Sequence, residues 1–292
     1  MIKLAVGASP KAALGSLSRA VNEAENARGA GGYSNDRYHR YLEWAGDQIY
    51  ALSSALSNDE IERLVATKLY SMLLSLDPSS VSTLTLGRLV DGELGQCIQR
   101  LKAAEERISA EERKWEQGSA VAVVLDTNVW LKYYQDPLQV DLNQVLDERA
   151  SVPLVVAVPM KVVDELDGHK RNRANPPKGG LPIRRRAALA LKYLEAQATA
   201  PGQRKLLKEQ VIANQSPSSN IYLTVLEQSL SQPSIQDADL EIIDRAAAIR
   251  PYAKHVKIVT TDYGMIYRAR QAGLDAVRIT DYEEEQEVPP QL

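Results

Sequence analysis

Apolar residues in the first part of the chain recur at helical spacing. The clearest stripe repeats every seven residues, at Leu94, Leu101, Ile108 and Trp115. It predicts an amphipathic helix over about residues 93–115, and similar spacing predicts helices over 35–56 and from residue 58 onward. We therefore expect residues 1–118 to form an all-α domain, which binds a protein partner, pairs with a second copy or serves regulation.

The pattern changes at about residue 119, where short continuous apolar runs begin. These runs predict buried strands over residues 121–125, 154–158, 221–226, 256–260 and 276–279. Helical patterns alternate with them, over residues 162–169, 184–196, 239–249 and 265–271. Buried strands that alternate with helices indicate an α/β domain with a mostly parallel sheet. We assign this domain to residues 119–282 and expect residues 283–292 to form a solvated acidic tail.

Composition excludes several kinds of site. The chain has 292 residues, a single cysteine and three histidines that lie far apart, so a disulfide within the chain or a Cys- or His-based metal centre is not expected. There is no apolar run long enough to span a membrane, and the apolar start is too short for a signal peptide. We therefore expect a cytoplasmic protein. With a net charge of −3, any nucleic-acid partner requires a local basic patch.

Two predicted strands end in an aspartate. Asp126 follows the first strand and Asp262 follows the strand over 256–260. In open α/β sheets, ligands bind outside the carboxyl ends of the strands. A single aspartate there is often a helix N-cap, but two in one sheet indicate a site.

Helical angles add further carboxylates. Asp239 lies on the same helix face as Ile242 and Ile243, whereas Glu241 and Asp244 point away from that face. On the helix over 162–169, Glu165 and Asp167 flank the apolar face on either side, and the angles do not choose between them.

Converging carboxylates repel one another unless a cation lies between them. Oxygen-only ligands favour Mg²⁺ or Mn²⁺, which activate water and neutralise charge on a phosphodiester. The sequence thus predicts phosphodiester hydrolysis.

Four motifs in order carry a family resemblance: the strand ending in Asp126-Thr-Asn128, then Asp-Glu165-Leu-Asp, Asp239-Leu-Glu-Ile-Ile-Asp and Thr-Thr-Asp262. Along residues 121–281 the chain resembles the PIN-domain nuclease family. The resemblance implies a Rossmann-like three-layer α/β/α fold and a metal-dependent nuclease that acts most often on RNA.

The same resemblance implies roles for single residues. The acidic catalytic and metal-binding set is Asp126, Glu165, Asp239 and Asp262, which favours Glu165 over Asp167. Thr127, Asn128 and Thr261 take supporting positions. Residues 198–236 are a departure from the small members of the family and indicate an added strand or hairpin. Tyr263 either stacks on a base or packs at the start of its helix.

A local basic segment follows Glu165. Residues 170–186 contain seven basic side chains and no acidic one, together with prolines and glycines that predict a loop. We expect these side chains to hold the phosphate backbone: Lys170, Arg171, Arg173, Lys178, Arg184, Arg185 and Arg186.

The sequence predicts a Mg²⁺- or Mn²⁺-dependent endoribonuclease that acts on single-stranded RNA. Three alternatives stay open: the toxin of a toxin–antitoxin pair, a structure-specific DNA nuclease, and a non-catalytic nucleic-acid-binding scaffold.

Overall fold

The computed structural model describes residues 2–29, 34–171, 181–197, 203–211, 219–226 and 235–279. Contacts divide the chain into two compact units, residues 1–112 and 113–292, which we describe one at a time. Among the described residues, no helix is long and apolar enough to cross a membrane.

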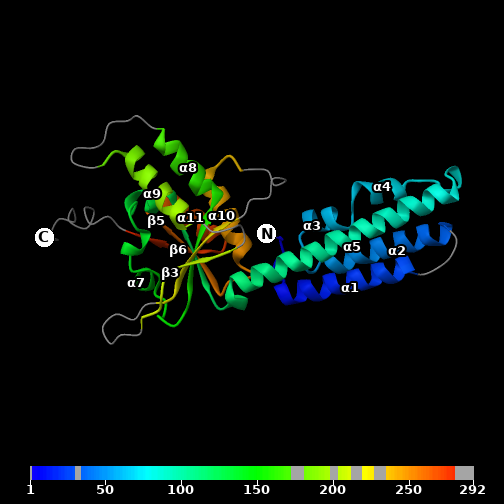
Figure 1. Ribbon diagram of the computed structural model, residues 1–292, viewed down its shortest axis with the longest axis horizontal. Helices are drawn as coiled ribbons and strands as arrows, with labels where there is room; N and C mark the ends of the chain where they lie inside the picture. Colours follow the sequence, from blue (N-terminus) through cyan, green and yellow to red (C-terminus); the bar gives the residue numbers. More distant parts are fainter. Residues whose placement is uncertain are drawn as a thin grey trace. The chain divides into compact units, whose positions relative to one another are not determined.

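The first unit is helical (Figure 1). Its helices are α1 (Pro10–Gly29), α2 (Ser34–Leu52), α3 (Asn58–Leu64), α4 (Lys68–Leu74) and α5 (Thr83–Lys114), with the short 3-10 helix η1 (Pro78–Ser80) before α5. The helical region that the sequence predicts is confirmed. Ion pairs join α5 to its neighbours, from Lys102 to Glu25 of α1 and from Asp91 to Arg37 of α2.

Helix α5 begins ten residues earlier than the sequence pattern predicts, at Thr83 instead of residue 93. Leu86 and Val90 are buried and extend the apolar stripe that Leu94 continues. The stripe is hard to recognise there because Leu84 and Leu89 are exposed on the other side of the helix and glycines interrupt it.

A buried carboxylate ties α5 to the start of α4. Glu93 is 2% exposed, and its Oε1 accepts hydrogen bonds from Thr67 Oγ1 at 2.7 Å and from Arg100 Nη2 at 2.9 Å. Thr67 is also the N-cap of α4 and accepts from the Tyr70 N–H. The charge of Glu93 is therefore paired, as a buried charge must be.

The second unit is built on one sheet. Its described strands are β1 (Val121–Leu125), β2 (Leu154–Pro159), β3 (Lys205–Lys208), β4 (Ile221–Leu226), β5 (His255–Thr260) and β6 (Asp275–Arg278). The six strands lie in the order β3-β4-β2-β1-β5-β6. Every pairing is parallel except that of β3 with β4. The mostly parallel sheet is thus confirmed, and the added strand appears as the antiparallel edge strand β3.

Helices pack against this sheet, and several lie next to one another (Figure 1). They are α6 (Thr127–Lys132), α7 (Leu142–Leu146), α8 (Met160–Lys170), α9 (Ile183–Gln197), α10 (Ala238–Ile249) and α11 (Tyr263–Gln271), with 3-10 turns η2 (Glu116–Gly118) and η3 (Pro137–Gln139). Strands β1 and β2 are buried along their whole length, which places them in the centre of the core. The carboxyl ends of β1 and β5 lead directly into α6 and α11, so the residues at those junctions face the ligand-binding edge of the sheet.

Candidate active site

Asp126 is the most buried carboxylate at this edge of the sheet. It follows β1 and is 4% exposed. Its Oδ2 accepts a hydrogen bond from Thr260 Oγ1 at 2.8 Å and another from Asn128 Nδ2 at 3.3 Å. These two donors hold the carboxylate in one orientation without neutralising its charge.

The parallel register of β1 and β5 brings Thr260 to Asp126. Leu125 pairs with Val259, and the Asp126 N–H donates to the Val259 carbonyl at 2.9 Å. Asp126 and Thr260, the residues that follow this pair, therefore lie next to each other. The sequence analysis missed Thr260 and selected Thr261, whose carbonyl accepts from Arg278 Nε at 3.4 Å. The role of Thr261 stays a prediction. A buried threonine that closes an apolar run is the signal that could have identified Thr260.

Glu165 reaches the same region from α8. Its Oε2 accepts a hydrogen bond of 2.6 Å from Thr127 Oγ1, and Thr127 follows Asp126 directly. Asp167, the alternative on that helix, instead pairs with Arg171. The structure thus places Glu165 beside the residues that follow β1 and directs Asp167 to a local ion pair.

Asp262 and Asp239 lie at the starts of two helices. Asp262 is the N-cap of α11, where its Oδ1 accepts from the Gly264 N–H at 2.6 Å. The Asp262 N–H in turn donates to Thr260 Oγ1 at 2.9 Å, so one threonine joins two of the carboxylate residues. Asp239 lies in the first turn of α10, and its carboxylate is one-third exposed.

Arg268 of α11 is the cation nearest to Asp239 in the described ion pairs. Its Nη1 lies 2.7 Å from Asp239 Oδ2 and 3.5 Å from Asp237 Oδ2. The sequence analysis gave Arg268 no role, because only the packing of α10 against α11 brings it to Asp239.

The four carboxylates influence one another electrostatically. Burial raises the pKa of Asp126, and the charge of Glu165 raises it further, against the lowering effect of the Thr260 hydrogen bond. Burial also raises the pKa of Asp239, and the charges of Asp126 and Asp262 add to the rise, while Arg268 opposes it. The site thus brings several negative charges near one another, and Asp126 is the one that is shielded from water.

The donor set fits a hard divalent cation, although the side chains are not gathered around one. Within the described ranges, no three or more Asp, Glu, His or Cys side chains are close enough to hold a metal ion as they stand. The oxygens are nevertheless of the kind that Mg²⁺ and Mn²⁺ prefer. Burial of the charged carboxylate contributes most to the raised pKa of Asp126, and a bound cation would offset that cost.

Part of the predicted basic segment is helical. Lys170 is the last residue of α8, one residue beyond the helix predicted over 162–169, which corrects the loop prediction at that position. Arg184, Arg185 and Arg186 form the first turn of α9 after Ile183, in agreement with the helix predicted over 184–196. A continuing apolar face explains the helical ends, since Leu166 and Ala187 are both buried.

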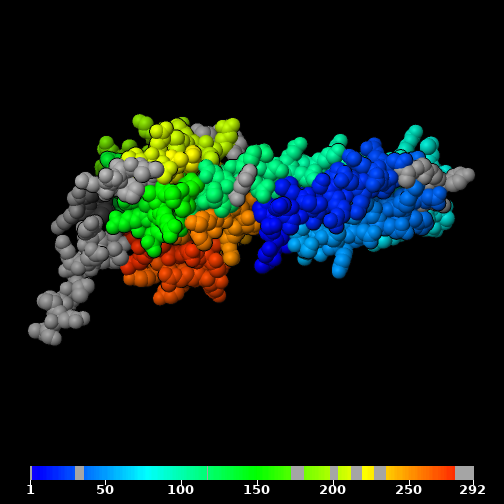
Figure 2. Space-filling model, turned by 90° about the horizontal axis from the view of Figure 1, so that it is seen from below, coloured from blue at the N-terminus to red at the C-terminus, as the bar shows by residue number. Residues whose placement is uncertain are grey.

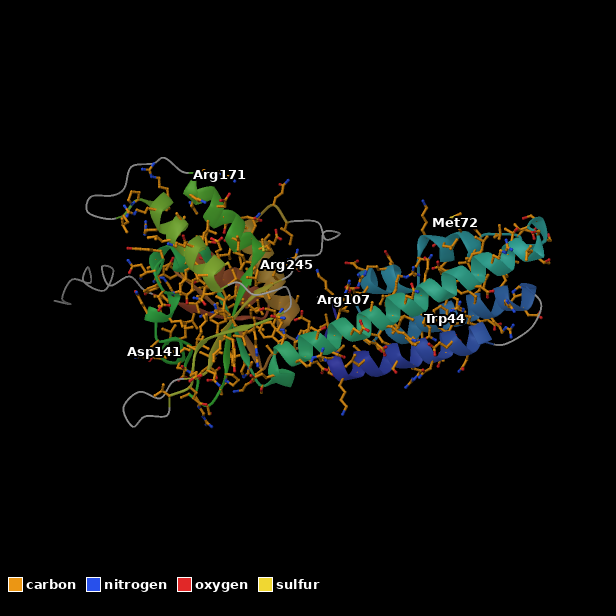
Figure 3. The ribbon with its side chains drawn as sticks, in the orientation of Figure 1. Trp44, Met72, Arg107, Asp141, Arg171 and Arg245 are labelled. Carbon is orange, nitrogen blue, oxygen red and sulfur yellow. The ribbon has the colours of Figure 1, made fainter. Side chains whose placement is uncertain are left out.

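The basic side chains differ in exposure. Lys170, Arg184 and Arg185 are exposed, whereas Arg186 is half-buried. Arg171, at the end of α8 (Figure 3), is also exposed and pairs with Asp167. Arg173 and Lys178 lie outside the described residues.

Glu241 differs from the sequence expectation. The angles place it away from the buried face of its helix, yet it is 2% exposed and pairs with Arg245 at 3.5 Å. Arg245 is labelled in Figure 3. Helix α10 contacts α8, α11, β2 and β5, so more than one of its faces is covered. A single-face analysis of angles does not detect this.

Comparison with known proteins gives one match. A family model described as PIN domain matches residues 123–280, which is more than half of the chain and includes all four carboxylates. No curated protein and no solved structure matches the chain.

The raised pKa of Asp126 predicts how stability depends on pH without metal. The folded protein binds the Asp126 proton more tightly than the unfolded chain, so the free energy of unfolding falls as pH rises from the unfolded value, about 4, through the folded pKa. We therefore expect Asp126→Asn to stabilise the protein in EDTA, by an amount that increases as the pH rises from about 4 and levels off above the folded pKa of Asp126. Urea unfolding at each pH measures this difference.

Asp164→Asn is the control, because Asp164 is an exposed carboxylate one residue before Glu165. The difference in stability between Asp164→Asn and wild type should be smaller than that of Asp126→Asn, because the carboxylate removed is exposed to solvent. If the change in stability caused by Asp126→Asn were independent of pH, the raised pKa assigned to the buried Asp126 would be wrong.

Proposed function

The chain belongs to the PIN-domain family, and on that basis we propose that it is a metal-dependent nuclease, an endoribonuclease that hydrolyses single-stranded RNA. The family is one of nucleases, so a nucleic acid is the partner. The observation that carries the proposal is the buried Asp126, oriented by Thr260 and electrostatically coupled to Glu165 and Asp239.

In this proposal Asp126, Glu165, Asp239 and Asp262 hold Mg²⁺ or Mn²⁺. The cation, when bound, supplies an activated water and neutralises charge on the phosphodiester. The other residues position these ligands. Thr260 and Asn128 orient the Asp126 carboxylate, and Thr127 orients that of Glu165.

The exposed basic side chains at the end of α8 and the start of α9 bind the substrate in this proposal. Lys170 ends α8, the helix that carries Glu165, and Arg184 and Arg185 lie in the first turn of α9, which packs against α8. These side chains can hold backbone phosphates while one linkage is cleaved. Arg173 and Lys178 are assigned to the same phosphate track from the sequence alone.

Asp126→Asn and Glu165→Gln should each reduce cleavage by about 100-fold or more. Each variant removes a charged oxygen ligand of the cation that would stabilise the negative charge developing on the phosphodiester. The measurement is cleavage of labelled single-stranded RNA, and of DNA with the same sequence, in EDTA, Mg²⁺ and Mn²⁺. Asp164→Asn should cleave as wild type does.

Cleavage in EDTA, or full activity of Asp126→Asn with a normal metal requirement, would refute the assigned mechanism. Cleavage of DNA but not RNA would retain the nuclease and reject the ribonuclease.

Thr260→Val should lower the cleavage rate per folded molecule by about 10- to 100-fold, since it removes the donor that orients Asp126. Thr224→Val is a matched control. Thr224 is also a fully buried strand threonine, but its hydroxyl donates to the Gln203 carbonyl at 2.9 Å. We expect the control to lose stability and keep its rate. Equal rate losses in both variants would show that Thr260 acts only through the fold.

Replacing Lys170, Arg184 and Arg185 together by Gln should weaken binding to single-stranded RNA and flatten its dependence on salt. Three lost phosphate contacts lower the slope of log affinity against log salt by about 2. Binding is measured in the Asp126→Asn background to prevent turnover. The control replaces Lys11, Arg19 and Lys68, exposed cations of the helical unit, and should leave the slope unchanged. The same slope in both triple variants would exclude the proposed phosphate track.

A further inference from the structure

Two tyrosine rings are exposed next to the candidate active site. Tyr263 follows Asp262 directly and is 59% exposed, and Tyr267 is 69% exposed. Both belong to α11 and are four residues apart, so they share one face of that helix. Both tyrosines therefore lie on one face of the helix that Asp262 caps.

The rings are not needed to anchor α11 in the core. Met265, Ile266 and Ala269 supply the buried contacts of this helix. Of the two roles that the sequence left open for Tyr263, packing at the start of the helix does not account for a ring that is more than half exposed.

Arg278 holds the Tyr263 ring in place. Its guanidinium carbon lies 3.9 Å from the ring centroid, and its Nη1 donates to the Tyr263 hydroxyl. Its Nε donates to the Thr261 carbonyl at 3.4 Å, which ties the same guanidinium to the backbone beside Asp262. The ring is thus stacked against a cation and is still largely exposed to solvent. Because the side chain is already held, it loses little conformational entropy when a second planar group binds.

The charge of this region suits a nucleic acid. Arg268 and Arg270 follow Tyr267 on α11 and are exposed, although Arg268 also pairs with Asp239, and Arg278 lies on β6. In Figure 2 the segment from α10 to β6, coloured orange to red, forms one continuous surface. Aromatic rings among arginines bind unpaired bases by stacking and backbone phosphates by charge.

We propose that Tyr263 and Tyr267 form a stacking platform for unpaired bases beside the carboxylates, with Arg278 fixing the first ring. The platform rests on the proposed function, because it names the substrate class of the same site: a single strand. In a duplex the faces of the bases are already stacked, and the platform has no face to bind.

The test compares binding of single strands and duplexes to the full chain. All variants are made in the Asp126→Asn background and measured in EDTA, by fluorescence anisotropy with short labelled RNA and DNA. Tyr263→Ala and Tyr267→Ala remove each ring, and Tyr263→Phe keeps the ring and removes only the hydroxyl. Tyr50→Ala is the matched control, since Tyr50 is an 84% exposed tyrosine of the helical unit.

Each alanine variant of the platform should weaken single-strand binding by about five-fold or more and leave duplex binding unchanged. Tyr263→Phe should bind within about two-fold of its parent, since the π-face persists, and Tyr50→Ala should match the parent. A single strand that carries 2-aminopurine adds a direct readout of stacking. Its fluorescence should be quenched on binding, and the quenching should be relieved in Tyr263→Ala.

Platform variants that bind as Tyr50→Ala does, or that weaken single strands and duplexes equally, would overturn the platform. Cleavage by the wild type with metal is measured separately. If cleavage persists while the alanine variants bind normally, the platform alone fails. If wild type does not cleave but the alanine variants lose single-strand binding, the nuclease assignment fails and the platform stands as a binding surface.

Discussion

The hydrogen bond from Thr260 to Asp126 is the contact on which the rest of the site depends. It joins the ends of two parallel strands that are distant in sequence, and it exists because Leu125 pairs with Val259. The Thr260 hydroxyl also accepts a hydrogen bond from the Asp262 N–H, so one hydroxyl contacts both of the aspartates that follow strands. Burial disfavours the charge of Asp126 and raises its pKa, and a cation bound beside the carboxylate would offset that cost.

Helix α11 brings several parts of the site together. Its N-terminus is capped by Asp262, its last turns carry Arg268 to Asp239, and its exposed face carries Tyr263 and Tyr267. Without a metal, Arg268 offsets part of the negative charge of Asp239. Negative charge at the edge of the sheet and positive charge around it suit a site that holds a cation and a polyanion together.

Much of the fold could be predicted from sequence, because burial leaves a local pattern. The runs at β1 and β2 are fully buried and read directly as strands, and the family resemblance over the second half agrees with the match to residues 123–280. Predictions of helix bounds and of burial failed where buried and exposed residues do not follow a simple apolar stripe. Exposed Leu84 and Leu89 hid the first turns of α5, and Glu241 is buried because α10 is covered on several faces.

Local patterns in the sequence identify the acidic residues of the site and their order. Asp126 and Asp262 follow apolar runs, and Glu165 and Asp239 occupy defined positions on predicted helices. Angles alone left Glu165 and Asp167 equivalent, and the family resemblance favoured Glu165. In the structure Glu165 accepts a hydrogen bond from Thr127, whereas Asp167 pairs with Arg171. The contacts of Thr260 with Asp126, of Arg268 with Asp239 and of Arg278 with Tyr263 are seen only in the folded protein. Those contacts depend on strand register and helix packing between distant segments, which no local spacing of residues encodes.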